Sequence, residues 1–119
     1  MQFMTIYKFG HVILVGFPHT DLHTISKRPA AILYDSGDKD VLVTRITSQK
    51  YTTESDYKVQ NWKECGLITE SYIRLGKLAT IDKSHILKPL GVLNDLEIEQ
   101  MKAILKKIFK LKIRDTKHE

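Results

Sequence analysis

The sequence predicts an α+β fold in which a small, strongly curved antiparallel sheet or barrel packs against one C-terminal helix. Apolar runs of strand length dominate residues 11–81, turn-forming residues separate them, and the clearest helical pattern comes last. The chain has 119 residues, of which 42% are hydrophobic, so it can bury a core without disulfides or metals. We therefore expect a single domain over residues 1–119.

Composition limits the classes of function. Apolar runs such as residues 12–17 are too short to span a bilayer, and residues 1–10 lack the pattern of a signal peptide, so we expect the cytoplasm and no membrane partner. The single Cys65 excludes an internal disulfide, and the five histidines lack ligand spacing, so no metal or other cofactor is expected. The net charge of +5 is compatible with a polyanionic partner.

Three strands are predicted in the first half of the chain. Residues 11–17 form a nearly continuous β-branched run, typical of a strand buried on both faces. Residues 19–26 are polar and too long for a tight hairpin, which makes them a candidate functional loop. Residues 30–34 predict the second strand, residues 35–40 a turn, and residues 41–48 the third strand.

The junction before the second strand places one arginine in a special position. Pro29 has no N–H and a fixed φ, so it belongs at the first residue of a strand, with Arg28 at the mouth of the sheet. An arginine there can donate two N–H groups to one phosphate, which lysine cannot do. The alternative is a solvated charge at a strand start.

The second half is less regular until residue 71. Residues 49–57 are polar and without periodicity, residues 57–62 alternate weakly as in an edge strand, and residues 64–67 resemble a turn. Residues 71–81 alternate with period two, which predicts a long bent strand. One face of it would carry Tyr72, Arg74 and Gly76, and the other Ile73, Leu75 and Lys77.

A helix is predicted from Asp95 to about Lys112. Asn94 precedes it as N-cap with Glu97 three residues on, and Leu93 and Ile98 occupy the hydrophobic-staple positions. The apolar stripe comprises Ile98, Met101, Leu105 and Ile108, whereas Lys102, Lys106, Lys107 and Lys110 lie off it. Such lysines are more typical of a solvated face than of a nucleic-acid interface.

Several short blocks along residues 7–111 occur in the order and spacing of a known family. They are residues 10–15, 17–21, 27–30, 46–48, 71–74 and 79–82. Together they resemble the MazF/PemK family of bacterial toxins. The resemblance implies an SH3-like antiparallel β-barrel with a C-terminal helix, as in MazF, PemK and CcdB, and a homodimer. It also implies a metal-independent endoribonuclease that cleaves single-stranded RNA, inhibits growth and is silenced by a cognate antitoxin.

The same resemblance suggests residue roles. Arg28 would clamp the phosphate and is a candidate proton donor, Arg74 would be a second cation, and Thr47 and Ser48 would bind phosphate or orient the 2′-OH. Hydroxyls at a strand end also commonly cap a turn, which is the alternative for Thr47 and Ser48. The candidate substrate-binding residues are His19, Thr20, Asp21, His23, Lys27 and Lys77.

One departure from the family concerns the general base. Many members have Asp two residues after the arginine of the late strand, where this chain has Gly76. His19 or His23, which titrate near neutral pH, are candidate replacements, although both could be exposed loop residues without a role. Two other classes of function stay open: a barrel that binds RNA without cleaving it, and a CcdB-like barrel that poisons a topoisomerase.

Overall fold

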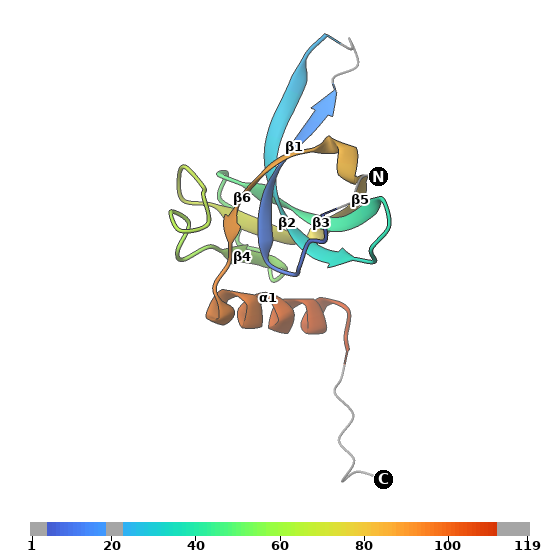
Figure 1. Ribbon diagram of the computed structural model, residues 1–119. Coiled ribbons are helices and arrows are strands. Elements are labelled where there is room, and N and C mark those ends of the chain that lie inside the picture. Colours follow the sequence, from blue (N-terminus) through green and yellow to red (C-terminus); the bar gives the residue numbers. More distant parts are fainter. Residues whose placement is uncertain (1–4, 19–22, 112–119) are drawn as a thin grey trace.

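The computed structural model describes residues 5–18 and 23–111, which contain six strands and one α-helix (Figure 1). The elements are β1 (His11–Pro18), β2 (Ile25–Asp35), β3 (Asp40–Thr47), β4 (Asp56–Lys58), β5 (Tyr72–Asp82), the 3-10 turn η1 (Lys83–His85), β6 (Ile86–Val92) and α1 (Asp95–Ile108). All strand pairs are antiparallel, in the order β4-β5-β3-β2-β1-β6. The predicted combination of a curved antiparallel sheet and a C-terminal helix is confirmed. Among the described residues no ladder joins β4 to β6, so the sheet is open and closure into a barrel is not confirmed.

The core consists of two apolar clusters, one on each face of the sheet. Successive residues of a strand point to opposite faces, so Val12 joins the cluster beneath α1 while Ile13 joins the other. Both side chains are fully buried, which confirms that β1 is buried on both faces. The α1 side also contains Ile46, Ile73, Leu75 and Met101, and the opposite side Val15, Ala30, Ile32, Val43 and Ile81.

Strand β2 is longer than predicted. It begins at Ile25, so the last two residues of the expected loop, 25–26, belong to a ladder in which Arg28 pairs with Val15 and Pro29 with Leu14. Pairing with β3 begins only at Ala30, because a proline cannot donate a ladder hydrogen bond. The first part of β2 therefore follows β1 alone, and the two strands project beyond the sheet as a hairpin (Figure 1).

Strands β4 and β5 differ from the sequence prediction in detail. The edge strand β4 is confirmed but covers only Asp56–Lys58, because the chain beyond it enters turns over residues 60–66 that are closed by local backbone hydrogen bonds. In β5 the register shifts between the pairs Arg45–Arg74 and Thr44–Leu78, so residues 75–77 form a bulge. The predicted alternation, which put Lys77 on one face with Ile73 and Leu75, ends there: Leu75 is buried and Lys77 is exposed.

Strand β6 has no counterpart in the prediction, because Pro89 and Gly91 interrupt its apolar pattern. The structure gives Gly91 a packing reason: a Cβ there would lie 2.5 Å from the backbone carbon of Cys65. Gly66 has φ +78° and would place a Cβ 2.1 Å from the carbonyl oxygen of Leu90. These two glycines let the segment after β4 pack directly on β6.

The helix begins as predicted and ends earlier. The side chain of Asn94 accepts a hydrogen bond from the Glu97 N–H at 2.9 Å, which confirms the N-cap. Glu97 itself is buried and does not complete a capping box: its Oε1 accepts from the Tyr57 hydroxyl at 3.0 Å and from the Gln60 N–H at 2.6 Å. The helix ends at Ile108 instead of near Lys112, and a left-handed residue, φ 55° at position 110, follows it.

Candidate active site

Three arginines from neighbouring strands share one face of the sheet. Arg45 on β3 lies opposite both Ala30 on β2 and Arg74 on β5, and directly opposed residues project from the same face. Arg28 is two residues before Ala30 and therefore shares that face as well. Sequence reasoning selected Arg28 and Arg74 but missed Arg45. Its position two residues before Thr47, in a strand that was predicted, was the signal that could have identified it.

Two cavities open on this face, and Arg28, Pro29 and Arg45 line both of them. The first, of about 410 Å³, is mainly polar and is also lined by Thr47 and Ser48. This cavity lies at the point where β2 separates from β3. Pairing between the two strands begins at Ala30, and Arg28 therefore has no partner on β3. The second, of about 390 Å³, is mainly apolar and includes Phe17, Val43, Gly76, Lys77, Leu78 and Ala79 in its lining.

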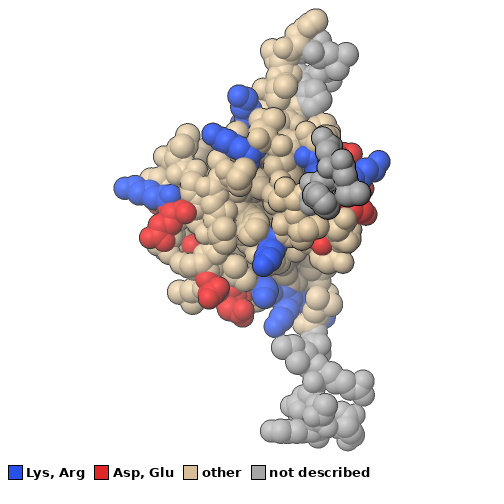
Figure 2. All heavy atoms as spheres, in the orientation of Figure 1, with Lys and Arg blue, Asp and Glu red and all other residues tan. Residues whose placement is uncertain are grey.

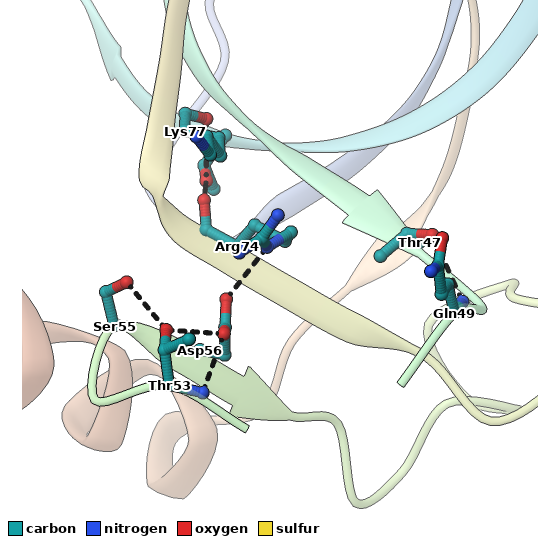
Figure 3. Close-up of polar contacts among 8 residues, drawn as sticks. Thr47, Gln49, Thr53, Ser55, Asp56, Arg74 and Lys77 are labelled. Atoms are coloured by element: carbon teal, nitrogen blue, oxygen red, sulfur yellow. Dashed lines mark hydrogen bonds and ion pairs between the residues drawn. The ribbon is translucent and has the colours of Figure 1, made fainter. Parts of the chain in front are cut away.

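Arg74 is held differently from the other two arginines and lines neither cavity. Its Nε donates to Asp56 Oδ1 at 3.0 Å, and the two side chains are only 14% and 1% exposed. The guanidinium carbon lies 3.5 Å from the centre of the Tyr51 ring, a cation–π contact. Figure 3 shows the Arg74 side chain directed at Asp56 on β4.

The Asp56 carboxylate is ionised and well supported. Burial acts to raise its pKa, but hydrogen bonds from Thr53 and Arg74 hold the pKa below the ordinary value of an aspartate. Asp56 Oδ2 accepts from the Thr53 hydroxyl at 2.6 Å and from the Thr53 N–H at 2.9 Å (Figure 3). In the sequence, Arg74 has no carboxylate two residues later, because that position is Gly76. In the fold, Asp56 on β4 is the carboxylate beside Arg74.

Thr47 caps a turn, which the sequence suggested as the alternative to a role in binding the phosphate. Its Oγ1 accepts a hydrogen bond from the Gln49 N–H at 3.1 Å (Figure 3). A hydroxyl that accepts one bond still has its own proton to donate, so the cap is compatible with binding an anion. Thr47 and Ser48 thus contribute hydroxyl groups to the wall of the polar cavity that Arg28 also lines.

The structure separates the predicted substrate-binding residues. Lys77 lines the apolar cavity, whereas Lys27 immediately precedes Arg28 and therefore projects from the opposite face of β2. His23 precedes β2 by two residues and is five residues from Arg28, roughly 16 Å along an extended chain. It lines neither cavity. The remaining three, His19, Thr20 and Asp21, lie outside the described residues.

Other features of the described chain do not mark a second site. Within residues 5–18 and 23–111 there is no group of three histidine, cysteine or carboxylate side chains that could hold a metal ion. The same residues contain no helix long and apolar enough to cross a membrane. Burial raises the pKa of the Cys65 thiol to about 11. Figure 2 shows lysine and arginine side chains at several places on the visible face with acidic side chains between them, so charge alone does not locate the site.

Comparison with known proteins places this geometry in context. A family model described as "PemK-like, MazF-like toxin of type II toxin-antitoxin system" matches residues 8–109. A search of curated protein sequences finds no significant match.

Solved structures share the fold at low sequence identity. An endoribonuclease from Mycobacterial species is 17% identical with a TM-score of 0.73, covering 95% of this chain and all of that one. Another Mycobacterial endoribonuclease, solved with its cognate antitoxin, is 16% identical with a TM-score of 0.71, covering 91% and 99%. MazE-MazF from Deinococcus radiodurans is 14% identical with a TM-score of 0.74, covering 92% and 100%.

Proposed function

The chain belongs to the family of PemK-like, MazF-like toxins of type II toxin-antitoxin systems, and from this membership we propose that it is an endoribonuclease toxin. In this proposal it cleaves single-stranded RNA without a metal ion and thereby inhibits growth. The observation that carries the proposal is the polar cavity lined by Arg28, Thr47 and Ser48, which combines a guanidinium with two hydroxyl groups. The endoribonucleases among the similar structures support it.

Cleavage of RNA requires three functions at one phosphate: a base for the 2′-OH, stabilisation of the charge on the phosphate, and an acid for the 5′-oxygen. The ribose 2′-oxygen attacks phosphorus and loses its proton to a base, and the bond from phosphorus to the 5′-oxygen breaks as that oxygen gains a proton. The products are a 2′,3′-cyclic phosphate and a 5′-hydroxyl. Arg28 stabilises the charge that develops on the pentacoordinate phosphate, and Thr47 and Ser48 donate hydrogen bonds to it or orient the 2′-OH. A normal arginine pKa is too high for efficient proton donation, so Arg28 acts electrostatically.

The proton acceptor is the least constrained part of this mechanism. Gly76 carries no side chain, and the Asp56 carboxylate is already engaged by Arg74 and Thr53. The candidate bases are the loop histidines His19 and His23, of which His23 lines neither cavity.

We also propose a cognate antitoxin as partner. Antitoxin complexes among the similar structures support this. The two exposed arginines that line both cavities suit an acidic, partly disordered segment that competes with RNA for the same cations. Such binding weakens as salt concentration rises.

Incubation of the purified protein with a long single-stranded RNA in EDTA tests the nuclease proposal. Discrete fragments ending in 2′,3′-cyclic phosphate are expected from wild type and not from Arg28→Ala purified in parallel, which controls for contaminating nuclease. Binding without fragments would favour the RNA-binding alternative. Inhibition of a topoisomerase, with neither RNA binding nor RNA fragments, would favour the CcdB-like alternative.

A further inference from the structure

Arg45 occupies the position between the two cavities. It lies on β3, with β2 on one side and β5 on the other, and its side chain is exposed. Arg28 and Arg45 line both cavities, whereas Arg74 lines neither. A phosphate at the wall that the cavities share would therefore meet Arg28 from β2 and Arg45 from β3.

Arg74 lacks the properties expected of a substrate-binding cation. Its charge is balanced by the buried Asp56, its Nε is used in that contact, and its guanidinium is stacked on Tyr51. Asp56 in turn is held by Thr53, so the charge of each partner in the pair is balanced within the protein. This is the pattern of a largely buried ion pair that connects β4 to β5, and removing one partner of such a pair leaves an uncompensated charge in the protein.

We propose that Arg45, and not Arg74, is the second cation that contacts the scissile phosphate, together with Arg28. This inference rests on the proposed ribonuclease function and changes the assignment of one catalytic residue within it. Two guanidinium groups from different strands can each donate paired N–H groups to the phosphate oxygens. Arg74 is a positioning residue that, with Asp56, keeps the edge strand β4 on the sheet next to the site.

The arrangement of the cavities agrees with this role. A phosphodiester has one nucleoside on each side, and the two arginines separate a polar cavity from an apolar one. With the phosphate at the shared wall, the polar cavity offers hydrogen bonds from Thr47 and Gln49 to one nucleoside. The apolar cavity offers Phe17 and Leu78 as surfaces for the base of the other.

Variants at Arg45 test the contact. Arg45→Ala is expected to reduce kcat/KM for RNA cleavage by about a hundredfold or more, and Arg45→Lys to recover part of that loss. Lys106→Ala, which removes one exposed charge from α1, is the matched control and should cleave like wild type. Binding of a non-cleavable 2′-deoxy oligonucleotide gives an independent readout: Arg45→Ala should reduce the slope of log K against log salt by about 1.

The ion pair is tested by removing both charges together. If Arg74 is a positioning residue, Arg74→Met combined with Asp56→Asn should keep cleavage within a few fold of wild type, because no unpaired charge is left buried. The inference is overturned if this folded double variant loses a hundredfold in kcat/KM, or if Arg45→Ala cleaves and binds like wild type. If wild type does not cleave RNA, the proposed function fails, and the salt slope still decides whether Arg45 contacts phosphate.

Discussion

Arg28 is exposed on β2 and belongs to neither apolar cluster of the core. Replacing it with alanine should leave the protein folded and reduce kcat/KM by a few hundredfold, about 3 to 4 kcal/mol, because the phosphate charge loses one oriented donor. Cleavage of a fluorogenic single-stranded RNA and a thermal melt measure the two effects. Lys107→Ala on α1 should change neither by much. Equal cleavage by Arg28→Ala and wild type would contradict the site.

Asp56 makes the stability of the protein depend on pH. Despite burial, hydrogen bonds from Thr53 and Arg74 lower the pKa of this carboxyl, so its contribution is fully present at neutral pH. The contribution is lost as the pH falls below the unfolded value of about 4 and through the lower folded value. Urea unfolding of wild type between pH 7 and pH 3 should show this loss.

The matched variant is Asp56→Asn, which cannot be ionised. It should be less stable than wild type at pH 7, with a free energy of unfolding that changes less steeply in acid. Parallel pH profiles for the two proteins would show that Asp56 does not contribute. Asp35, whose pKa is also lowered, remains in both proteins and provides a common background.

At the scale of elements, Glu97 joins α1 to β4, through Tyr57, and to the segment that follows it, through Gln60. Glu97→Ala removes the acceptor of both the Tyr57 hydroxyl and the Gln60 N–H in a buried place. We expect a loss of about 2 to 3 kcal/mol in the free energy of unfolding, because two donors lose their partner. Chemical denaturation of purified variants measures the change.

The N-cap provides the comparison for this prediction. Asn94→Ala removes one partly buried hydrogen bond at the same helix end and should cost about 1 kcal/mol. Asp56 also lies on β4, so weakening the contact between α1 and β4 by Glu97→Ala should disturb the ion pair between Asp56 and Arg74. Loss of the N-cap alone should not disturb it. A Glu97→Ala variant no less stable than Asn94→Ala would show that the buried contact is not a stabilising link.

For the whole molecule, we predict a symmetric homodimer. Both edges of the open sheet are unpaired within the described chain, and Ile25, Phe17 and Leu87 are 59%, 40% and 46% exposed. Ile25 and Leu87 lie together, since both approach Gly16. Sedimentation at micromolar concentration should give about twice 13.8 kDa, and Ile25→Lys should shift the protein towards monomer. A monomeric wild type across that range would contradict the prediction.

Several parts of this protein were predictable from the sequence because they depend on neighbours along the chain. The alternation in β5, the apolar run of β1 and the Asn94 cap are local patterns with periods of two or a few residues. The blocks around Arg28 and Thr47 likewise indicated the family. Strand β6 was missed because Pro89 and Gly91 break the local pattern, and the reason for Gly91 is its close approach to the backbone of Cys65, which is distant in the sequence.

The composition of the site was decided only by the tertiary structure. Asp56 and Arg74 are 18 residues apart, and their contact depends on the register of β4 against β5. Whether Arg45 lies beside Arg28 depends on where β2 leaves β3, and the bulge after Arg74 determines where Lys77 projects. The sequence by itself therefore determined strands β1 to β5, the helix start and the residue types at the site. Which residues of neighbouring strands lie opposite each other depends on the register of the ladders. A single bulge or a shortened ladder changes that register, and the sequence around it carries no pattern that reveals the change.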